Sequence, residues 1–168
     1  LRVDALRSTL AVEDERGRLT PRQEIEIADA TARALRYEGV RMTTTHAQLP
    51  DNWYSHWDAA GRTAVVSVYA FADLVQVPMT AYLAYEIILN GMNNASPHYD
   101  LQAIAHEETR GCLFDFCGDK REMEIKLQTM DLCPACRRHL GGIGIDVDAV
   151  LRMTDVVRGL AVAEPAPA

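Results

Sequence analysis

Residues 111–140 read GCLFDFCGDKREMEIKLQTMDLCPACRRHL, and this stretch contains all four cysteines of the 168-residue chain. The cysteines are spaced Cys112-x4-Cys117-x15-Cys133-x2-Cys136. Two pairs of thiols, each close in sequence and joined by a short segment, are typical of a tetrahedral zinc site. We therefore predict one zinc ion bound by these four cysteines, in a module that spans residues 106–140.

The residues around the cysteines favour thiolate ligands. Asp119 is a predicted helix N-cap with Glu122 as its capping-box partner, so Cys117 would precede a helix N-terminus, where peptide dipoles stabilise negative charge. Five cations could offset the charge of the zinc–thiolate group: Arg110, Lys120, Arg121, Arg137 and Arg138. A zinc ion with four protein sulfurs has no open coordination position, which indicates a structural role.

Two disulfides, four free thiols or a redox-active CxxC motif are the alternative interpretations of the cysteines. Disulfides form in oxidising compartments, and the sequence does not start with a charged and then apolar segment of the secretory type. A redox CxxC would leave Cys112 and Cys117 unexplained. The sequence therefore favours a zinc site in a cytoplasmic protein.

The composition is that of a globular protein, with 48% hydrophobic and 24% charged residues. The net charge of −7 argues against binding to nucleic acid or anionic membranes, because both require a basic surface. No apolar run reaches the length of a transmembrane helix. We predict a single domain over residues 1–160 and a flexible tail over residues 161–168.

Strand-like and helix-like segments are mixed along the chain, which predicts a small α/β or α+β fold with a C-terminal helix. Thr20 and Gln23 form a capping box for a helix that ends near Gly39. The clearest strand is AVVSVYA at residues 64–70, and its unbroken apolar character indicates a central position in the sheet. The other expected elements are strands at 2–10 and 40–45, a loop at 51–61, a helix at 78–90 ended by Gly91, a short helix at 101–109 capped by Asp100, a flexible link at 141–144 and a last helix at 146–160 capped by Asp146.

The order of a strand, helical segments, Gly-Cys, x4-Cys and CPAC over residues 64–140 resembles the archaemetzincin family of zinc metallopeptidases. In that family a helix bears HExxHxxGxxH, and the cysteine pairs that follow bind a second, structural zinc ion. The resemblance implies a metzincin-like sheet-and-helix domain and assigns the structural zinc to Cys112, Cys117, Cys133 and Cys136. The chain departs from the family in a shorter gap between the cysteine pairs and in lacking a Met soon after the second cysteine.

The catalytic motif of that family is absent at the matching positions. Counted back from Cys112, the motif falls on LQAIAHEETRG, where Leu101, Ala105 and Gly111 replace the three histidines and Gln102 replaces the general base. A gapped match to the preceding helix keeps only the base, as Glu86. The resemblance thus implies a scaffold that kept its structural zinc and lost its catalytic one, while a zinc knuckle attached to an unrelated α/β domain is the alternative.

Glu86, His98 and His106 are the weak candidates for a remodelled catalytic site. We favour a simpler role for His106, as a hydrogen-bonding partner beside the cysteines, because such groups are common around zinc ligands. Arg110 and Asp115 flank the first cysteine and could pair with each other. Structural roles are favoured for both.

Three functions follow from these observations. The preferred one is a non-catalytic, zinc-stabilised interaction or accessory domain with a protein partner, for which the aromatic stretch Trp53–Trp57 is a candidate contact surface; the alternative is that these side chains cover the sheet edge. The second is a zinc metallopeptidase with a diverged centre. The third is a nucleic-acid-binding zinc ribbon, which the acidic charge opposes.

Overall fold

The computed structural model describes residues 20–34, 36, 38–50, 53–58 and 62–162. The chain divides into two compact units, Leu1–Tyr69 and Ala70–Ala168. The expected strand at residues 2–10 and most of the expected tail lie outside the described residues. Helices together with a small mixed sheet confirm the α/β prediction.

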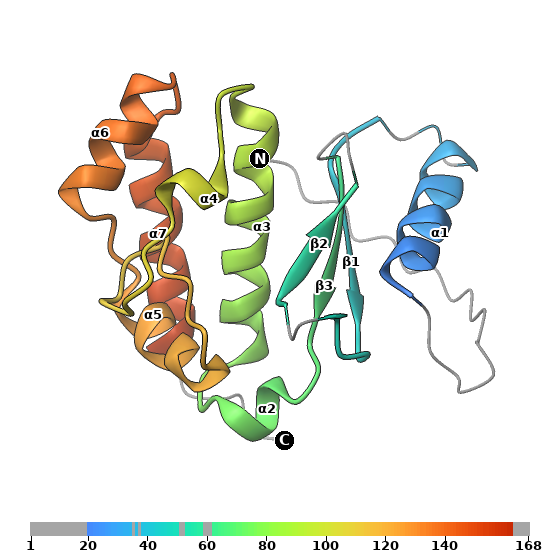
Figure 1. Ribbon diagram of the computed structural model, residues 1–168, viewed down its shortest axis with the longest axis horizontal. Coiled ribbons are helices and arrows are strands. Elements are labelled where there is room, and N and C mark those ends of the chain that lie inside the picture. Colours follow the sequence, from blue (N-terminus) through green and yellow to red (C-terminus); the bar gives the residue numbers. More distant parts are fainter. Residues whose placement is uncertain (1–19, 35, 37, 51–52, 59–61, 163–168) are drawn as a thin grey trace. The chain divides into compact units, whose positions relative to one another are not determined.

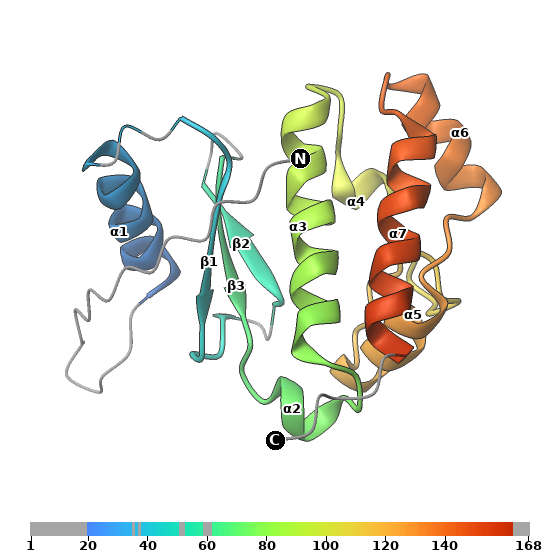
Figure 2. The same ribbon diagram turned by 180° about the vertical axis from the view of Figure 1, so that it is seen from behind.

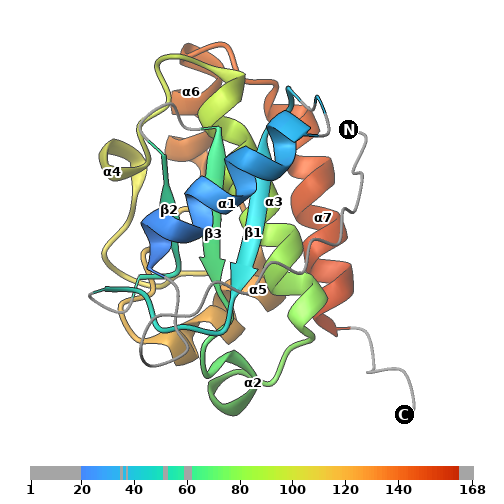
Figure 3. The same ribbon diagram turned by 90° about the vertical axis from the view of Figure 1, so that its right-hand side faces the viewer.

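The first unit contains a helix and a three-stranded sheet. Helix α1 (Pro21–Ala34) begins at the predicted capping box, in which Gln23 N donates to Thr20 Oγ1 at 3.3 Å and Thr20 N donates to Gln23 Oε1 at 2.8 Å. Strand β3 (Thr63–Ser67) lies between β1 (Arg41–Thr45), which is parallel to it, and β2 (Ser55–Trp57), which is antiparallel. Helix α1 packs against β1 and β3, as Figure 3 shows.

The strand predicted at residues 64–70 is β3, which begins at Thr63 and ends at Ser67. Its predicted central position is confirmed, because all five of its residues are buried and both of its edges are paired. The loop predicted at residues 51–61 is wrong over 55–57, where β2 pairs with β3. Trp57 therefore belongs to an edge strand, opposite Ala64, whereas Trp53 lies outside the strand and is partly exposed.

The second unit is helical (Figure 1). It contains α2 (Phe71–Leu74), α3 (Met79–Ala95), α4 (Leu101–Ile104), the 3-10 turn η2 (Lys120–Glu122), α5 (Met123–Thr129), α6 (Pro134–Gly142) and α7 (Val147–Val162). Helix α7 packs along α3 and α5, and Figures 1 and 2 show α3 and α7 side by side from opposite directions. None of the helices in the described part of the chain combines the length and apolar character needed to cross a membrane.

Three predicted boundaries in this unit differ from the structure. Helix α3 continues through Gly91 to Ala95, because buried Met92 extends the apolar face of Ile88 and Leu89. Helix α6 includes Gly141 and Gly142, which the sequence placed in a flexible link.

Helix α4 begins at the predicted cap, where Asp100 Oδ1 accepts from Gln102 N at 2.9 Å, but it ends at Ile104 instead of Thr109. The chain becomes extended at Ala105, so that His106 N donates to Phe114 O and Phe116 N donates to His106 O, both at 2.8 Å.

The core of the second unit is built from side chains of α3, α5 and α7 and from the segments between them. Leu127 of α5 is fully buried, whereas Ile125, two residues earlier on the same helix, is 53% exposed. Helix α5 lies between the two cysteine pairs in the sequence. Its packing therefore helps to fix the positions of both pairs.

We expect Leu127→Ala to lower the free energy of unfolding by about 2–5 kcal/mol, because it removes buried methyl groups and leaves a cavity. The matched control Ile125→Ala should change it by less than about 0.5 kcal/mol, since Ile125 is largely exposed. Urea titration followed by circular dichroism measures both. Equal effects of the two substitutions would contradict the packing described.

Candidate metal centre

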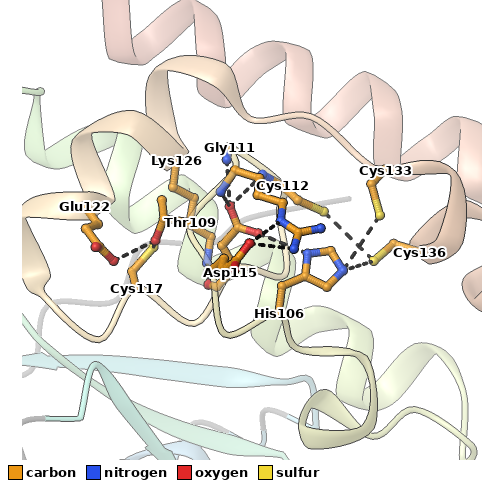
Figure 4. Close-up of polar contacts among 12 residues, drawn as sticks. His106, Thr109, Gly111, Cys112, Asp115, Cys117, Glu122, Lys126, Cys133 and Cys136 are labelled. Atoms are coloured by element: carbon orange, nitrogen blue, oxygen red, sulfur yellow. Dashed lines mark hydrogen bonds and ion pairs between the residues drawn. The ribbon is translucent and has the colours of Figure 1, made fainter.

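Four side chains of the second unit bring potential metal ligands together. The Nε2 or Nδ1 atom of His106 and the Sγ atoms of Cys112, Cys133 and Cys136 all lie within 4.8 Å of one another. His106 follows α4, Cys112 lies in the next loop, and Cys133 and Cys136 belong to the N-cap and first turn of α6. Figure 4 shows the imidazole directed at the sulfurs of Cys133 and Cys136. Among the described residues, no other group of His, Cys, Asp and Glu side chains meets in this way.

Three of the six separations among these ligand atoms are close to the edges of a tetrahedron around one metal ion, and the others are no longer than 4.8 Å. Zinc–sulfur bonds of about 2.3 Å and zinc–nitrogen bonds of about 2.0 Å imply edges of about 3.8 Å between sulfurs and about 3.5 Å between sulfur and nitrogen. Cys112 Sγ and Cys136 Sγ are 3.9 Å apart, and His106 Nε2 is 3.7 Å from Cys133 Sγ and 3.3 Å from Cys136 Sγ. A disulfide requires about 2.05 Å between sulfurs, and all four cysteines are free thiols.

This ligand set differs from the predicted one by a single residue. Cys112, Cys133 and Cys136 meet as predicted, but Cys117 is outside the group and His106 takes the fourth position. His106 was expected only as a hydrogen-bonding partner or a weak catalytic candidate. A site of three cysteines and one histidine is, like the predicted site of four cysteines, an established form of structural zinc centre.

Backbone geometry explains why Cys117 is not part of the group. Cys117 has a left-handed backbone, with φ of 52°. Its buried Sγ lies 3.7 Å from Thr109 Oγ1, and Thr109 in turn donates to Glu122 Oε2 at 2.6 Å. In the view of Figure 4 these three side chains lie on the other side of Asp115 from the sulfur cluster. Burial raises the pKa of the Cys117 thiol, which favours its neutral form.

Asp115 connects the imidazole to the loop that bears Cys112. Its Oδ1 lies 3.0 Å from His106 Nδ1, and its Oδ2 accepts from the backbone N–H of Arg110, Gly111 and Cys112 at 2.6, 2.7 and 2.9 Å. The carboxylate is completely shielded from solvent. The predicted pairing of Asp115 with Arg110 thus involves the Arg110 backbone, whereas the Arg110 guanidinium pairs with Glu108.

Lys126 of α5 holds the backbone of Asp115. The buried Nζ donates to Asp115 O and lies at hydrogen-bond distance from Tyr85 Oη of α3, both at 2.6 Å. Burial lowers the pKa of this ammonium, while the neighbouring groups Cys117, Glu86 and Asp115 act to raise it. Asp115 was expected only to play a structural role beside the first cysteine, and Lys126 was not selected from the sequence at all, because neither belongs to the cysteine spacing.

The thiols of the cluster have unequal surroundings. Burial raises the pKa of Cys112 and of Cys136. Burial also acts to raise the pKa of Cys133, but hydrogen bonds from the Cys136 backbone, the Cys136 thiol and the Ala135 backbone leave it lowered. Cys133 is the N-cap of α6 and Pro134 occupies the first turn, so the free N–H groups of that helix favour a thiolate at Cys133. We predicted that a helix N-terminus would favour the thiolate form of Cys117. This effect instead occurs at Cys133.

The cations near the cysteines mostly pair with carboxylates. Arg121 pairs with Asp119, and Arg137 pairs with Asp131. Asp119 is an N-cap as predicted, since its Oδ1 accepts from Arg121 N at 2.9 Å. The other half of the predicted capping box is replaced, because Glu122 bonds to Thr109 instead.

The remaining catalytic candidates lie outside the ligand group. Glu86 is fully buried on α3, and its Oε2 accepts from Asn90 Nδ2 at 3.1 Å. His98 is exposed in the loop before α4, and its backbone N donates to Ser96 Oγ at 3.2 Å. The structure does not bring Glu86, His98 and His106 together as a set of metal ligands.

No family model, curated protein or solved structure matches the chain. The similarity to archaemetzincins therefore stays a hypothesis that rests on the cysteine spacing.

We expect Gly111→Ala to destabilise the loop that holds Cys112. Gly111 has φ of 87°, and a Cβ there would lie 2.5 Å from Thr129 Cβ, so the substitution adds both backbone strain and a clash. The predicted loss is on the order of 1–3 kcal/mol in the free energy of unfolding, measured by urea titration. Gly142→Ala, in α6 with open space around it, is the matched control and should be neutral or slightly stabilising.

Proposed function

We propose that the chain is a zinc-stabilised, non-catalytic domain that acts by binding a protein partner. The observation that supports this most is the convergence of one imidazole and three thiols at the spacing of a tetrahedral centre. Thiolates and imidazole together select zinc over the hard cations magnesium and calcium, which prefer oxygen ligands. The thiol ligands also suit a reducing compartment, and we propose the cytoplasm.

A structural role for the zinc follows from the number of ligands. Catalytic zinc keeps a position for water, whereas His106, Cys112, Cys133 and Cys136 would fill all four positions. Structural zinc in small domains contributes on the order of 10 kcal/mol to folding. The ion would fasten the loop at Cys112 and the start of α6 to the segment that follows α4.

The proposed partner is a protein, because the net charge of −7 disfavours polyanions and several of the basic groups near the cysteines are paired with carboxylates. This argument also weighs against the nucleic-acid-binding zinc ribbon.

The peptidase alternative is weakened by two observations. A peptidase of the archaemetzincin type would need a second metal ion. In that family all four cysteines bind the structural ion, whereas Cys117 here lies apart from the other three.

Metal content distinguishes the two ligand sets. We expect one zinc per chain for the parent protein and for Cys117→Ser, because Cys117 is not among the converging ligands. His106→Ala should lose zinc to a mild chelator that leaves the parent loaded, because it removes one of four ligands. Elemental analysis after dialysis against the chelator measures both. If Cys117→Ser loses zinc while His106→Ala retains it, the four cysteines are the ligands and His106 is not.

We expect no zinc-dependent cleavage when the zinc-loaded protein is incubated with an unbiased peptide library. Mass spectrometry of the library detects products. The control is Glu86→Gln, which removes the one carboxylate that aligns with the peptidase base and leaves the four zinc ligands intact. Cleavage by the parent that disappears in Glu86→Gln would make the protein a peptidase.

A further inference from the structure

We propose that Asp115 is the positioning residue of the zinc centre, and that it sets zinc affinity by selecting the tautomer of His106. This inference rests on the proposed zinc site and identifies the residue that makes the imidazole a ligand. Asp115 is not itself a ligand in this arrangement, because its two oxygens are directed to His106 Nδ1 and to three backbone N–H groups.

The first step of the argument concerns the proton on the imidazole. A neutral histidine carries one N–H and one lone pair on its two ring nitrogens. Nε2 faces the sulfurs, 3.3 Å from Cys136 Sγ, so metal binding at Nε2 requires the proton on Nδ1. Asp115 Oδ1 lies 3.0 Å from Nδ1 and can only accept when the carboxylate is ionised, which places the proton there.

The second step concerns the orientation of the carboxylate. Three consecutive backbone N–H groups, of residues 110–112, converge on Oδ2 at 2.6–2.9 Å, so that oxygen is committed to the loop that carries Cys112. The backbone of Asp115 is held separately, through its carbonyl, by the buried ammonium of Lys126. Contacts to Oδ2 and to the backbone carbonyl of Asp115 therefore keep its Oδ1 facing His106.

An asparagine at this position would reverse the tautomer. The asparagine side chain has a single acceptor oxygen. The three backbone N–H groups of the loop and the imidazole would compete for that one oxygen. The oxygen would stay with the backbone donors, and the amide NH2 would face His106 Nδ1. Nδ1 would then have to accept, the ring proton would move to Nε2, and the atom that faces the sulfurs would lose its lone pair.

Asp131→Asn provides a matched control. Asp131 also lies in the cysteine module, two residues before Cys133, and its Oδ1 accepts from Leu132 N at 2.7 Å and pairs with Arg137. Its carboxylate thus faces Leu132 N and Arg137 and its side chain is 56% exposed, so the same change of charge should leave zinc affinity within about twofold of the parent, as expected of an exposed surface substitution.

The experiment is a titration of the metal-free protein with cobalt(II), followed by displacement with zinc. The sulfur-to-cobalt absorption band reports the thiolate ligands, and the ligand-field bands report tetrahedral geometry. We expect Asp115→Asn to bind ten- to a hundredfold more weakly than the parent, in line with the effect of removing partners of metal-bound histidines. Parent-like affinity in Asp115→Asn would overturn the proposal, and a parent that binds neither metal would overturn the proposed zinc site instead.

A second measurement needs no substitution in Asp115 and therefore does not depend on the folding of that variant. Long-range proton–nitrogen NMR spectra assign the tautomer of each histidine, with His106 identified from the His106→Gln spectrum. In the zinc-loaded parent we expect the proton on Nδ1 and the metal on Nε2. In Asp115→Asn, where it folds, the metal-free ring should carry its proton on Nε2. A parent protonated on Nε2 would refute the positioning role, whatever the affinities are.

Discussion

The proposed metal centre depends on the meeting of one imidazole and three sulfurs from four points of the chain between residues 106 and 136. These side chains come from an extended segment, a loop and the first turn of α6. Nothing in local helix or strand propensity holds these elements in register, and several of them are only one or two turns long. A metal ion bound by these four side chains would close the loops, because the affinity of its ligands becomes folding free energy.

Three groups around the candidate ligands hold them in place. Asp115 orients the ring of His106 and, through a single oxygen, gathers three consecutive N–H groups of the loop at Cys112. Lys126 joins the same residue to α3 through Tyr85. Helix α6 presents its N-terminus to Cys133, where the pKa of the thiol is lowered despite burial. The Asp115 carboxylate thus acts on His106 and the loop at Cys112, the Lys126 ammonium acts on Asp115, and the N-terminus of α6 acts on Cys133.

The position of Glu86 bears on the hypothesis of a metallopeptidase-like centre. A general base must reach a metal-bound water, but Glu86 is fully buried on α3 and contacts Asn90 of the same helix. His106, the histidine closest in sequence to the cysteines, is engaged with their sulfurs. These features agree with the proposed structural role of the metal site, in which the function resides in the surfaces that the domain presents.

Much of this centre could be predicted from residue spacing, because two pairs of cysteines joined by a short segment are typical of one metal site. The spacing of Cys112, Cys133 and Cys136 was sufficient to place them together, and the caps at Thr20, Asp100 and Asp146 were visible because a cap acts within three residues of itself. The central strand at residues 63–67 was recognisable because burial on both faces requires a continuous apolar run.

The choice between Cys117 and His106 as the fourth ligand was decided only by the tertiary structure. It depends on the left-handed backbone at Cys117 and on the pairing of His106 with residues 114–116. The same holds for Asp115 and Lys126, whose roles arise from contacts with residues up to 41 positions away. Spacing in the sequence determines which side chains can approach a common point, but the direction in which each one faces is set by backbone torsions and hydrogen bonds between distant segments.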